Sequence, residues 1–184
     1  MARSKRTRGN RKMNPTLFVF CEGETEESYV AFLRSKYRVP IQIKTKIAGN
    51  RITQRLVKSY MKGETQTPKD KIFLLYDLDV QGVLERLKKI DKAELLISNP
   101  CIELWFLLHY QNQTATLDSD HCLRILKNHI PKYRKGAQKD TVMSDLCEKA
   151  DAAIERANEL SSPDNPSTTV QSFVQLLKDL KRNK

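Results

Sequence analysis

The chain has 184 residues, of which 39% are hydrophobic and 30% are charged. This length suits one ordinary domain with its own core, and the hydrophobic content excludes a compositionally disordered chain. No apolar run approaches the roughly 20 residues that cross a bilayer, so we expect no membrane segment. The first residues, MARSKRTRGNRK, are basic with no apolar segment behind them. We therefore expect no secretory signal and a cytoplasmic protein.

The formal net charge is +11 and the isoelectric point is about 9.6. Such an excess attracts polyanions, of which nucleic acid, DNA or RNA, is the commonest. Part of the excess lies at the N-terminus, where no acidic residue accompanies Arg3, Lys5, Arg6, Arg8, Arg11 and Lys12. We predict that residues 1–14 form a basic flexible arm that makes non-specific phosphate contacts. A solubilising tail is the alternative.

The cysteines are scattered along the chain and share no C-x-x-C spacing; they are Cys21, Cys101, Cys122 and Cys147. Disulfide frameworks and zinc sites place their cysteines at characteristic short spacings. We therefore predict free, buried thiols in a reducing cytoplasm.

Extended and helical patterns alternate after the basic arm. Residues 17–21 (LFVFC) form a continuous apolar run that predicts a strand buried on both faces. Apolar residues at helical spacing follow Thr25, which we expect near the N-cap of a helix. Residues 41–47 alternate as a strand does, and residues 51–62 predict a basic amphipathic helix.

The alternation continues with residues 72–76 (IFLLY), which predict a second fully apolar strand. The patterns then predict a helix over 82–91, a short strand over 95–97 and an apolar helix over 100–109. Strands that alternate with helices indicate an α/β fold with a mainly parallel sheet flanked by helices, here over residues 15–110.

The remainder of the chain has a different character. Residues 111–120 are polar, and helical patterns follow over 120–129, 139–160 and 168–182. We therefore predict a helical C-terminal extension over residues 111–184, packed on the α/β domain.

Acidic residues follow two of the buried strands, at the point where each strand ends. Glu22 comes directly after the first apolar strand, and Asp77 and Asp79 follow the second. Functional groups collect at the carboxyl ends of strands in parallel sheets, so we expect these side chains to meet. Carboxylates held close together need a cation, and oxygen ligands without a His or Cys cluster select Mg²⁺, Mn²⁺ or Ca²⁺ over zinc. A polar loop after a strand is the alternative for the aspartate pair.

Glu26 lies four residues beyond Glu22 and can converge with it if a helix begins near Thr25. A simpler interpretation of Glu26 is a first-turn charge that favours the helix dipole.

These residues carry a family resemblance. A hydrophobic strand that ends in Glu-Gly, followed by one that ends in Asp-x-Asp, resembles the Toprim metal site of topoisomerases, primases and OLD-type nucleases. More narrowly, four segments resemble the RloB family: FVFCEGETE (18–26), YDLD (76–79), NPCIELWFLLH (99–109) and NPSTTV (165–170). The resemblance implies a Toprim-like fold and a Toprim-type nuclease of restriction and phage-defence loci, working beside an ATPase in bacteria or archaea. The chain has no G-x-x-x-x-G-K-[ST] loop of its own, so an ATPase would be another protein.

The same resemblance implies residue roles. Glu22, Asp77 and Asp79 match the Toprim glutamate and aspartate pair, and Glu26 matches the second glutamate of the OLD-type form. Glu103, in the Asn-Pro-x-x-Glu-Leu-Trp segment, is a further candidate for the acidic cluster, with a helix N-terminal acid after Pro100 as its alternative. We hypothesise that the first three residues hold one Mg²⁺ or Mn²⁺, while Glu26 and Glu103 contribute to a second ion or act as a base.

Cationic residues are candidates for phosphate contacts. Lys135 lies in a basic segment with an aromatic residue and could stabilise the transition-state charge, although a solvated surface lysine is the alternative. We predict that the nucleic-acid-binding residues are Arg51, Arg55, Lys58, Lys132, Arg134 and Lys135. A solvated basic face is the competing interpretation of the helical members of this set.

Two other functions compete with a nuclease. In the first, the acidic cluster binds metal without cutting, and the chain is a nucleic-acid-binding sensor subunit of a defence complex. In the second, a tyrosine carries Toprim chemistry in strand passage or transfer. The short chain and the absence of a second DNA-gripping segment disfavour the second alternative.

Overall fold

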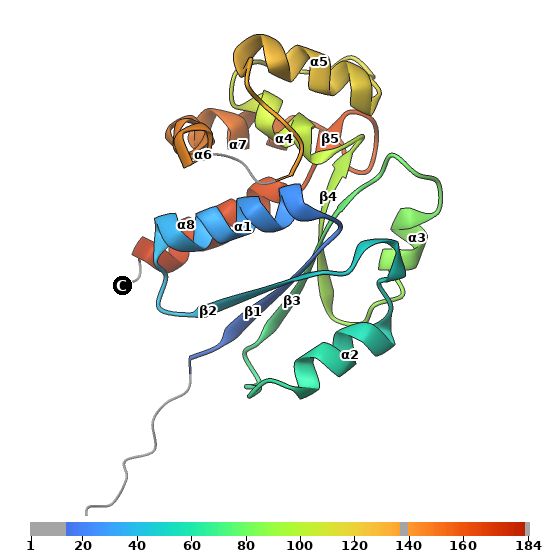
Figure 1. Ribbon diagram of the computed structural model, residues 1–184, viewed down its shortest axis with the longest axis vertical. Coiled ribbons are helices and arrows are strands. Elements are labelled where there is room, and N and C mark those ends of the chain that lie inside the picture. The colour runs from blue at the N-terminus through green and yellow to red at the C-terminus, as the bar shows by residue number, and fades with distance from the viewer. Residues whose placement is uncertain (1–13, 137–139, 183–184) are drawn as a thin grey trace, which may run out of the picture.

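A mostly parallel sheet of five strands, in the order β2-β1-β3-β4-β5, forms the centre of the computed structural model, which describes residues 14–136 and 140–182 (Figure 1). The strands are β1 (Thr16–Cys21), β2 (Gln42–Ile47), β3 (Lys71–Asp77), β4 (Ala93–Asn99) and β5 (Ser167–Thr168). The first four run parallel to their neighbours, whereas β5 pairs antiparallel with β4. The carboxyl ends of β1, β3 and β4 therefore meet at one edge.

Helices cover both faces of the sheet (Figure 1). One face carries α1 (Glu24–Tyr37), α4 (Ile102–Leu108), α5 (Ser119–His129), α6 (Asp140–Glu148), α7 (Ala150–Asn158) and α8 (Val170–Arg182). The other face carries the short 3-10 helix η1 (Gly49–Arg51), α2 (Gln54–Lys62) and α3 (Val83–Leu87). The predicted α/β class, with a mainly parallel sheet flanked by helices, is confirmed.

The residues of β1 explain why this strand is central. All six are buried. Leu17, Val19 and Cys21 pack into the core beneath α1 and α4, while Phe18 and Phe20 pack into the second core beneath α2. A strand buried on both faces needs apolar residues at every position, which accounts for the continuous run.

Several predicted boundaries were wrong by a few residues. The helix predicted over 51–62 begins only at Gln54, because the side chain of Thr53 caps it by accepting the N–H of Leu56 at 3.2 Å. The helix predicted over 139–160 is two helices, which are separated at Lys149. The first helix begins at Glu24 with Gly23 as its N-cap, so Thr25 is the second residue of the helix.

The C-terminal part contributes to the sheet, which the sequence did not predict. In β5, Ser167 and Thr168 pair with Asn99 and Ser98 of β4, and the hydroxyl oxygens of Ser98 and Thr168 lie 2.9 Å apart. A strand of two small polar residues carries no hydrophobic pattern. The division of the chain at residue 110 stays a prediction.

The predicted basic arm, with Arg3, Lys5, Arg6, Arg8, Arg11 and Lys12, lies outside the described residues. The four cysteines are free thiols, and three of them are buried while Cys147 is half-buried. Among residues 14–136 and 140–182, every helix is too short or too polar to span a membrane.

Candidate functional site

Two acid-bearing strand ends lie side by side at the carboxyl edge of the sheet. Cys21, the last residue of β1, is paired with Leu75 of β3, and the N–H of Glu22 donates to the carbonyl of Leu75 at 3.0 Å. The carboxylate of Glu22 then reaches across to β3 and accepts the backbone N–H of Asp77 at 3.0 Å. The predicted meeting of Glu22 with the end of β3 is therefore present.

Asp77 lies at the centre of the acidic cluster. Its Oδ1 accepts the backbone N–H of Ile102, the first residue of α4, at 2.8 Å. Burial raises the pKa of Asp77 well above its ordinary value. The nearby charge of Glu26 adds to this effect, and those of Glu103 and Glu22 contribute as well. The cluster thus resists holding all its charges without a cation.

Glu26 points back toward the strand end rather than into solvent. The side chain is buried, and its Oε2 accepts the N–H of Gly23 at 2.9 Å. Burial raises its pKa, and the charges of Glu103 and Glu22 act in the same direction. The bond to Gly23 caps the N-terminus of α1, and the buried carboxylate that makes it lies near the charges of Glu22 and Glu103.

Glu103 is the most deeply buried acid of the site, at 1% exposure. Its Oε1 accepts the hydroxyl of Tyr133 at 2.9 Å, whereas its Oε2 is buried and has no hydrogen-bond partner. The Nζ of Lys135 lies 3.8 Å from this Oε2. A buried oxygen without a donor is costly, and a bound cation would satisfy it.

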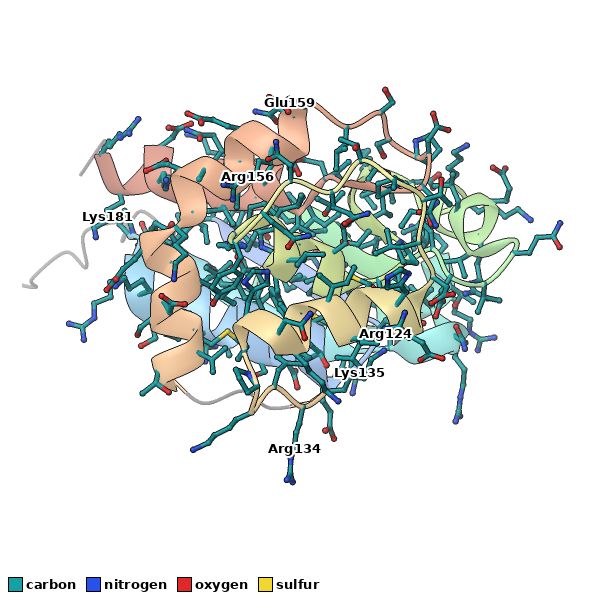
Figure 2. The ribbon with its side chains drawn as sticks, turned by 90° about the horizontal axis from the view of Figure 1, so that it is seen from above. Arg124, Arg134, Lys135, Arg156, Glu159 and Lys181 are labelled. Atoms are coloured by element: carbon teal, nitrogen blue, oxygen red, sulfur yellow. The ribbon has the colours of Figure 1, made fainter. Side chains whose placement is uncertain are left out.

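Two hydrogen bonds attach the segment that carries Lys135 to α1 and α4 beside the acidic cluster. Gly136 donates its N–H to the Thr25 hydroxyl of α1 at 2.8 Å, and Tyr133 binds Glu103 of α4. Although burial opposes the charged form, the carboxylate of Glu103 raises the pKa of Lys135 above its ordinary value. Figure 2 shows Lys135 beside α5, while Arg134 points away from the molecule. Lys135 therefore lies at the predicted site.

Asp79 occupies a more exposed position than the other acids. Strand β3 ends at Asp77, and Leu78 continues along β4 by donating its N–H to the carbonyl of Ser98 at 2.8 Å. Burial raises the pKa of Glu22, and the charge of Asp79 raises it further, which places the two carboxylates near one another. Asp79 also lines a cavity beyond the cluster.

Sequence reasoning missed two residues of the site. Tyr133 was noted only as an aromatic neighbour of Lys135, although its hydroxyl binds Glu103. Arg86 of α3 is half-buried, and its charge lowers the pKa of Glu22 against the effect of burial. Its Nε is buried without a hydrogen-bond partner. The sequence could have indicated Arg86, because it is a cation on the helix that directly follows the Asp-x-Asp strand.

The other predicted cations lie apart from the acids. Arg51 and Arg55 line a groove of about 440 Å³ beside α2, together with Lys46, which was not predicted. Lys58 is exposed on α2 outside that lining, and Lys132 is exposed on the segment before Lys135. Gly49 of η1, which does not line this groove, lies near the backbone carbonyl of Glu22.

The chemistry of the acidic cluster fits a hard divalent cation, but its side chains are not arranged as a complete ligand set. Glu22, Glu26 and Asp77 each accept a backbone N–H. Within the part of the chain that the structure describes, no three His, Cys, Asp or Glu side chains are close enough to hold an ion as they stand. The carboxylate oxygens, including the Oε2 of Glu103 that accepts no hydrogen bond, are nevertheless the donors that Mg²⁺ and Mn²⁺ prefer. Side-chain rotation at the cluster would be needed to form the site.

Comparison with known proteins gives one match. No curated protein and no solved structure matches the chain. The family model described as RloB-like protein matches residues 17–177. This range contains the whole sheet except the first residue of β1, as well as every acid of the cluster. The chain belongs to the RloB family.

Proposed function

We propose that this protein is a divalent-metal-dependent nuclease that hydrolyses phosphodiester bonds of nucleic acid. The observation that supports the proposal best is the hydrogen bond from the Asp77 N–H to the Glu22 carboxylate. It joins the acid-bearing ends of two adjacent parallel strands. Buried acids from α1 and α4 surround this contact, and a net charge of +11 attracts polyanionic substrates.

The acids have distinct proposed roles. Glu22, Asp77 and Asp79 would hold one Mg²⁺ or Mn²⁺, and Glu26 and Glu103 would contribute to a second ion or accept a proton from the attacking water. When bound, such an ion lowers the pKa of its water and neutralises charge on the phosphate. Burial raises the pKa of Glu26, which makes its carboxylate a stronger proton acceptor than an exposed glutamate.

Lys135 is the proposed transition-state cation. It is held by Tyr133 and Gly136 on either side, so its ammonium is positioned beside the acids before substrate binds. Because the ammonium is already in place, it can stabilise the negative charge that develops on the phosphate without any rearrangement of the site.

We further propose that the nuclease acts in antiviral defence, abortive infection or restriction-linked, beside a partner ATPase. Family membership supports this context, because RloB proteins accompany restriction and phage-defence loci. Nucleotide-driven control would come from the partner, since this chain has no phosphate-binding P-loop motif.

A non-catalytic sensor subunit is the second candidate. The observation that favours it is the engagement of Glu22, Glu26 and Asp77 with backbone N–H groups. Carboxylates that stabilise the turn geometry would be needed for folding even if no metal ever bound. The protein would then bind nucleic acid through its basic surfaces and pass a signal to its partner.

Incubation of purified protein with Mg²⁺ or Mn²⁺ and plasmid, single-stranded DNA and total RNA separates the two candidates. Glu22→Gln and Asp77→Asn preserve side-chain size but remove the charges, so each should lower cleavage about 100-fold or more. Glu159→Gln, a carboxylate change on the exposed end of α7, is the matched control and should retain activity.

Chelation of the metal should abolish the wild-type reaction. Nucleic-acid binding without cleavage under either metal, with an ATPase partner added, would select the sensor. Cleavage that persists in both acidic-cluster variants would exclude the proposed site.

A further inference from the structure

We propose that the cavity beside Asp79 binds an unpaired nucleobase of the nucleotide next to the scissile bond, with a preference for bases that carry an exocyclic amino group. This inference rests on the proposed nuclease function and names its substrate as single-stranded or base-flipped nucleic acid. The cavity has a volume of about 720 Å³. Ligand pockets of this kind span about 300–1,000 Å³, so one nucleoside fits.

The position of the cavity connects it with the site. Its wall includes Leu78 and Asp79 after β3 and Asn99 at the end of β4. Asp79 therefore faces both the acidic cluster and the cavity. On the β2 side of the cluster lies the basic groove of Arg51 and Arg55. A strand that follows the carboxyl edge would place phosphates on the groove, the scissile phosphate at the acids and the next nucleotide in the cavity.

The walls of the cavity are fixed by hydrogen bonds before any ligand arrives. The Asn165 side chain accepts the Leu117 N–H at 3.1 Å and donates to the Leu117 carbonyl at 2.8 Å. The Asn99 side-chain amide donates to the carbonyl of Pro163 at 2.8 Å. Leu78, Pro100 and Leu117 provide apolar surface. A pocket whose walls are already hydrogen-bonded, and which offers some apolar surface among polar groups, suits a flat base because little ordering entropy is lost on binding.

The polar groups of the cavity select against phosphate. Among the residues that the structure describes, its lining includes Asp79, Asp118 and Asp120 but no lysine or arginine. Asp118 is engaged as the N-cap of α5, where its carboxylate accepts the His121 N–H at 2.7 Å. Asp120 is exposed at the wall, and the Ser119 hydroxyl is buried without a hydrogen-bond partner. Carboxylates accept from exocyclic amino groups, as in recognition of cytosine N4.

A base can enter such a cavity only when it is neither paired nor stacked. Enzymes that read a base in a pocket therefore act on single strands or flip the nucleotide out of a duplex. The same requirement separates this protein from nucleases that grip an intact duplex through its phosphates alone.

The first test measures binding without cleavage. Backbone amide resonances of the wild-type protein are followed by NMR during titration with adenosine, cytidine, guanosine or uridine at millimolar concentration. The three amino-bearing nucleosides should shift the amides of Ser119, Asp120 and His121, with uridine about tenfold weaker. Asp120→Asn should reduce this discrimination, whereas Asp164→Asn, the same change in a loop outside the cavity lining, should preserve it.

The second test uses cleavage of a randomised single-stranded pool, followed by sequencing of the product ends. The wild type should show a base preference at one position beside the cut, and Asp120→Trp, which fills the cavity, should abolish it. Absence of nucleoside binding at the cavity, or an unaltered cleavage preference in Asp120→Trp, would overturn the inference. If the wild type binds nucleosides but cuts no nucleic acid, the nuclease function fails while the base-binding cavity stands.

Discussion

Asp77 is half-buried and has several acidic neighbours, and this environment has a consequence for stability. Its raised pKa means that the folded protein binds a proton more tightly than the unfolded chain does. Stability without metal should therefore be greatest below the ordinary aspartate pKa of about 3.9 for this group. The contribution is lost as pH rises from there through the raised folded pKa.

Asp77→Asn should accordingly stabilise the metal-free protein at neutral pH, because the amide oxygen can still accept the Ile102 N–H. One pKa unit corresponds to about 1.4 kcal/mol, and about 1 kcal/mol moves Tm by about 2–4 °C in a chain of this size. Thermal unfolding in chelator should show a rise of a few degrees at pH 7 and a smaller difference at pH 4. An equal difference at both pH values would contradict the assigned pKa direction.

Tyr133 donates its hydroxyl to the buried carboxylate of Glu103 at 2.9 Å. Tyr133→Phe removes this donor from a buried carboxylate, so we expect a loss of about 1–3 kcal/mol in the free energy of unfolding. Urea denaturation measures this value.

Tyr60→Phe is the matched control. The Tyr60 hydroxyl donates to the neutral backbone carbonyl of Thr45 at 3.1 Å, on the opposite face of the sheet. It should cost less, about 0.5–1.5 kcal/mol, and should leave any metal-induced stabilisation intact. A larger cost for Tyr60→Phe than for Tyr133→Phe would show that the bond to Glu103 is not the more important one.

At the scale of elements, the apolar runs of β1 and β3 allowed both strands and the acidic residues after them to be predicted. Each run is buried on both faces, so its hydrophobic pattern is unambiguous, and the acid that follows it falls at the sheet edge. No glycine or proline marks the break between α6 and α7 at Lys149, so the sequence pattern did not predict it.

The docking of residues 133–136 could not be predicted from local patterns. The bond from Gly136 to Thr25 joins residues that are 111 positions apart, and it depends on how α1, α4 and α5 pack. The segment also needs Gly136 at a φ of +96°, which is a conformation that other residues rarely adopt. Lys135 was therefore predictable as a candidate by composition but not as a neighbour of Glu103.

The groove beside α2 leads to a prediction about nucleic-acid affinity. If Arg51 and Arg55 contact phosphates, their joint replacement by alanine should weaken binding and reduce the slope of log affinity against log salt by about 2. Lys181→Ala with Arg182→Ala removes the same charge at the end of α8, which packs on the opposite face of the sheet from α2, and is the control. Equal salt slopes for the two double variants would show that the groove makes no specific contribution.

At the scale of the whole molecule, the C-terminal helices complete the core that supports the site. Phe173 of α8 is buried and its ring packs edge-on against Phe73 of β3, with ring centres 5.0 Å apart. Phe173→Ala should lower the free energy of unfolding by about 3–5 kcal/mol. The exposed Asp179→Ala on the same helix should change it by less than about 0.5 kcal/mol. Denaturant unfolding distinguishes the two, and a small effect of Phe173→Ala would mean that α8 is dispensable to the core.

The most direct test of the central claim is a calorimetric titration of Mn²⁺ into the wild-type protein, Glu22→Gln, Asp77→Asn and the control Glu159→Gln. We predict saturable binding in the wild type and the control, and a loss of about tenfold or more in affinity in both acidic-cluster variants. Equal Mn²⁺ affinity in the wild type and in Asp77→Asn would contradict a metal site at the joined ends of β1 and β3.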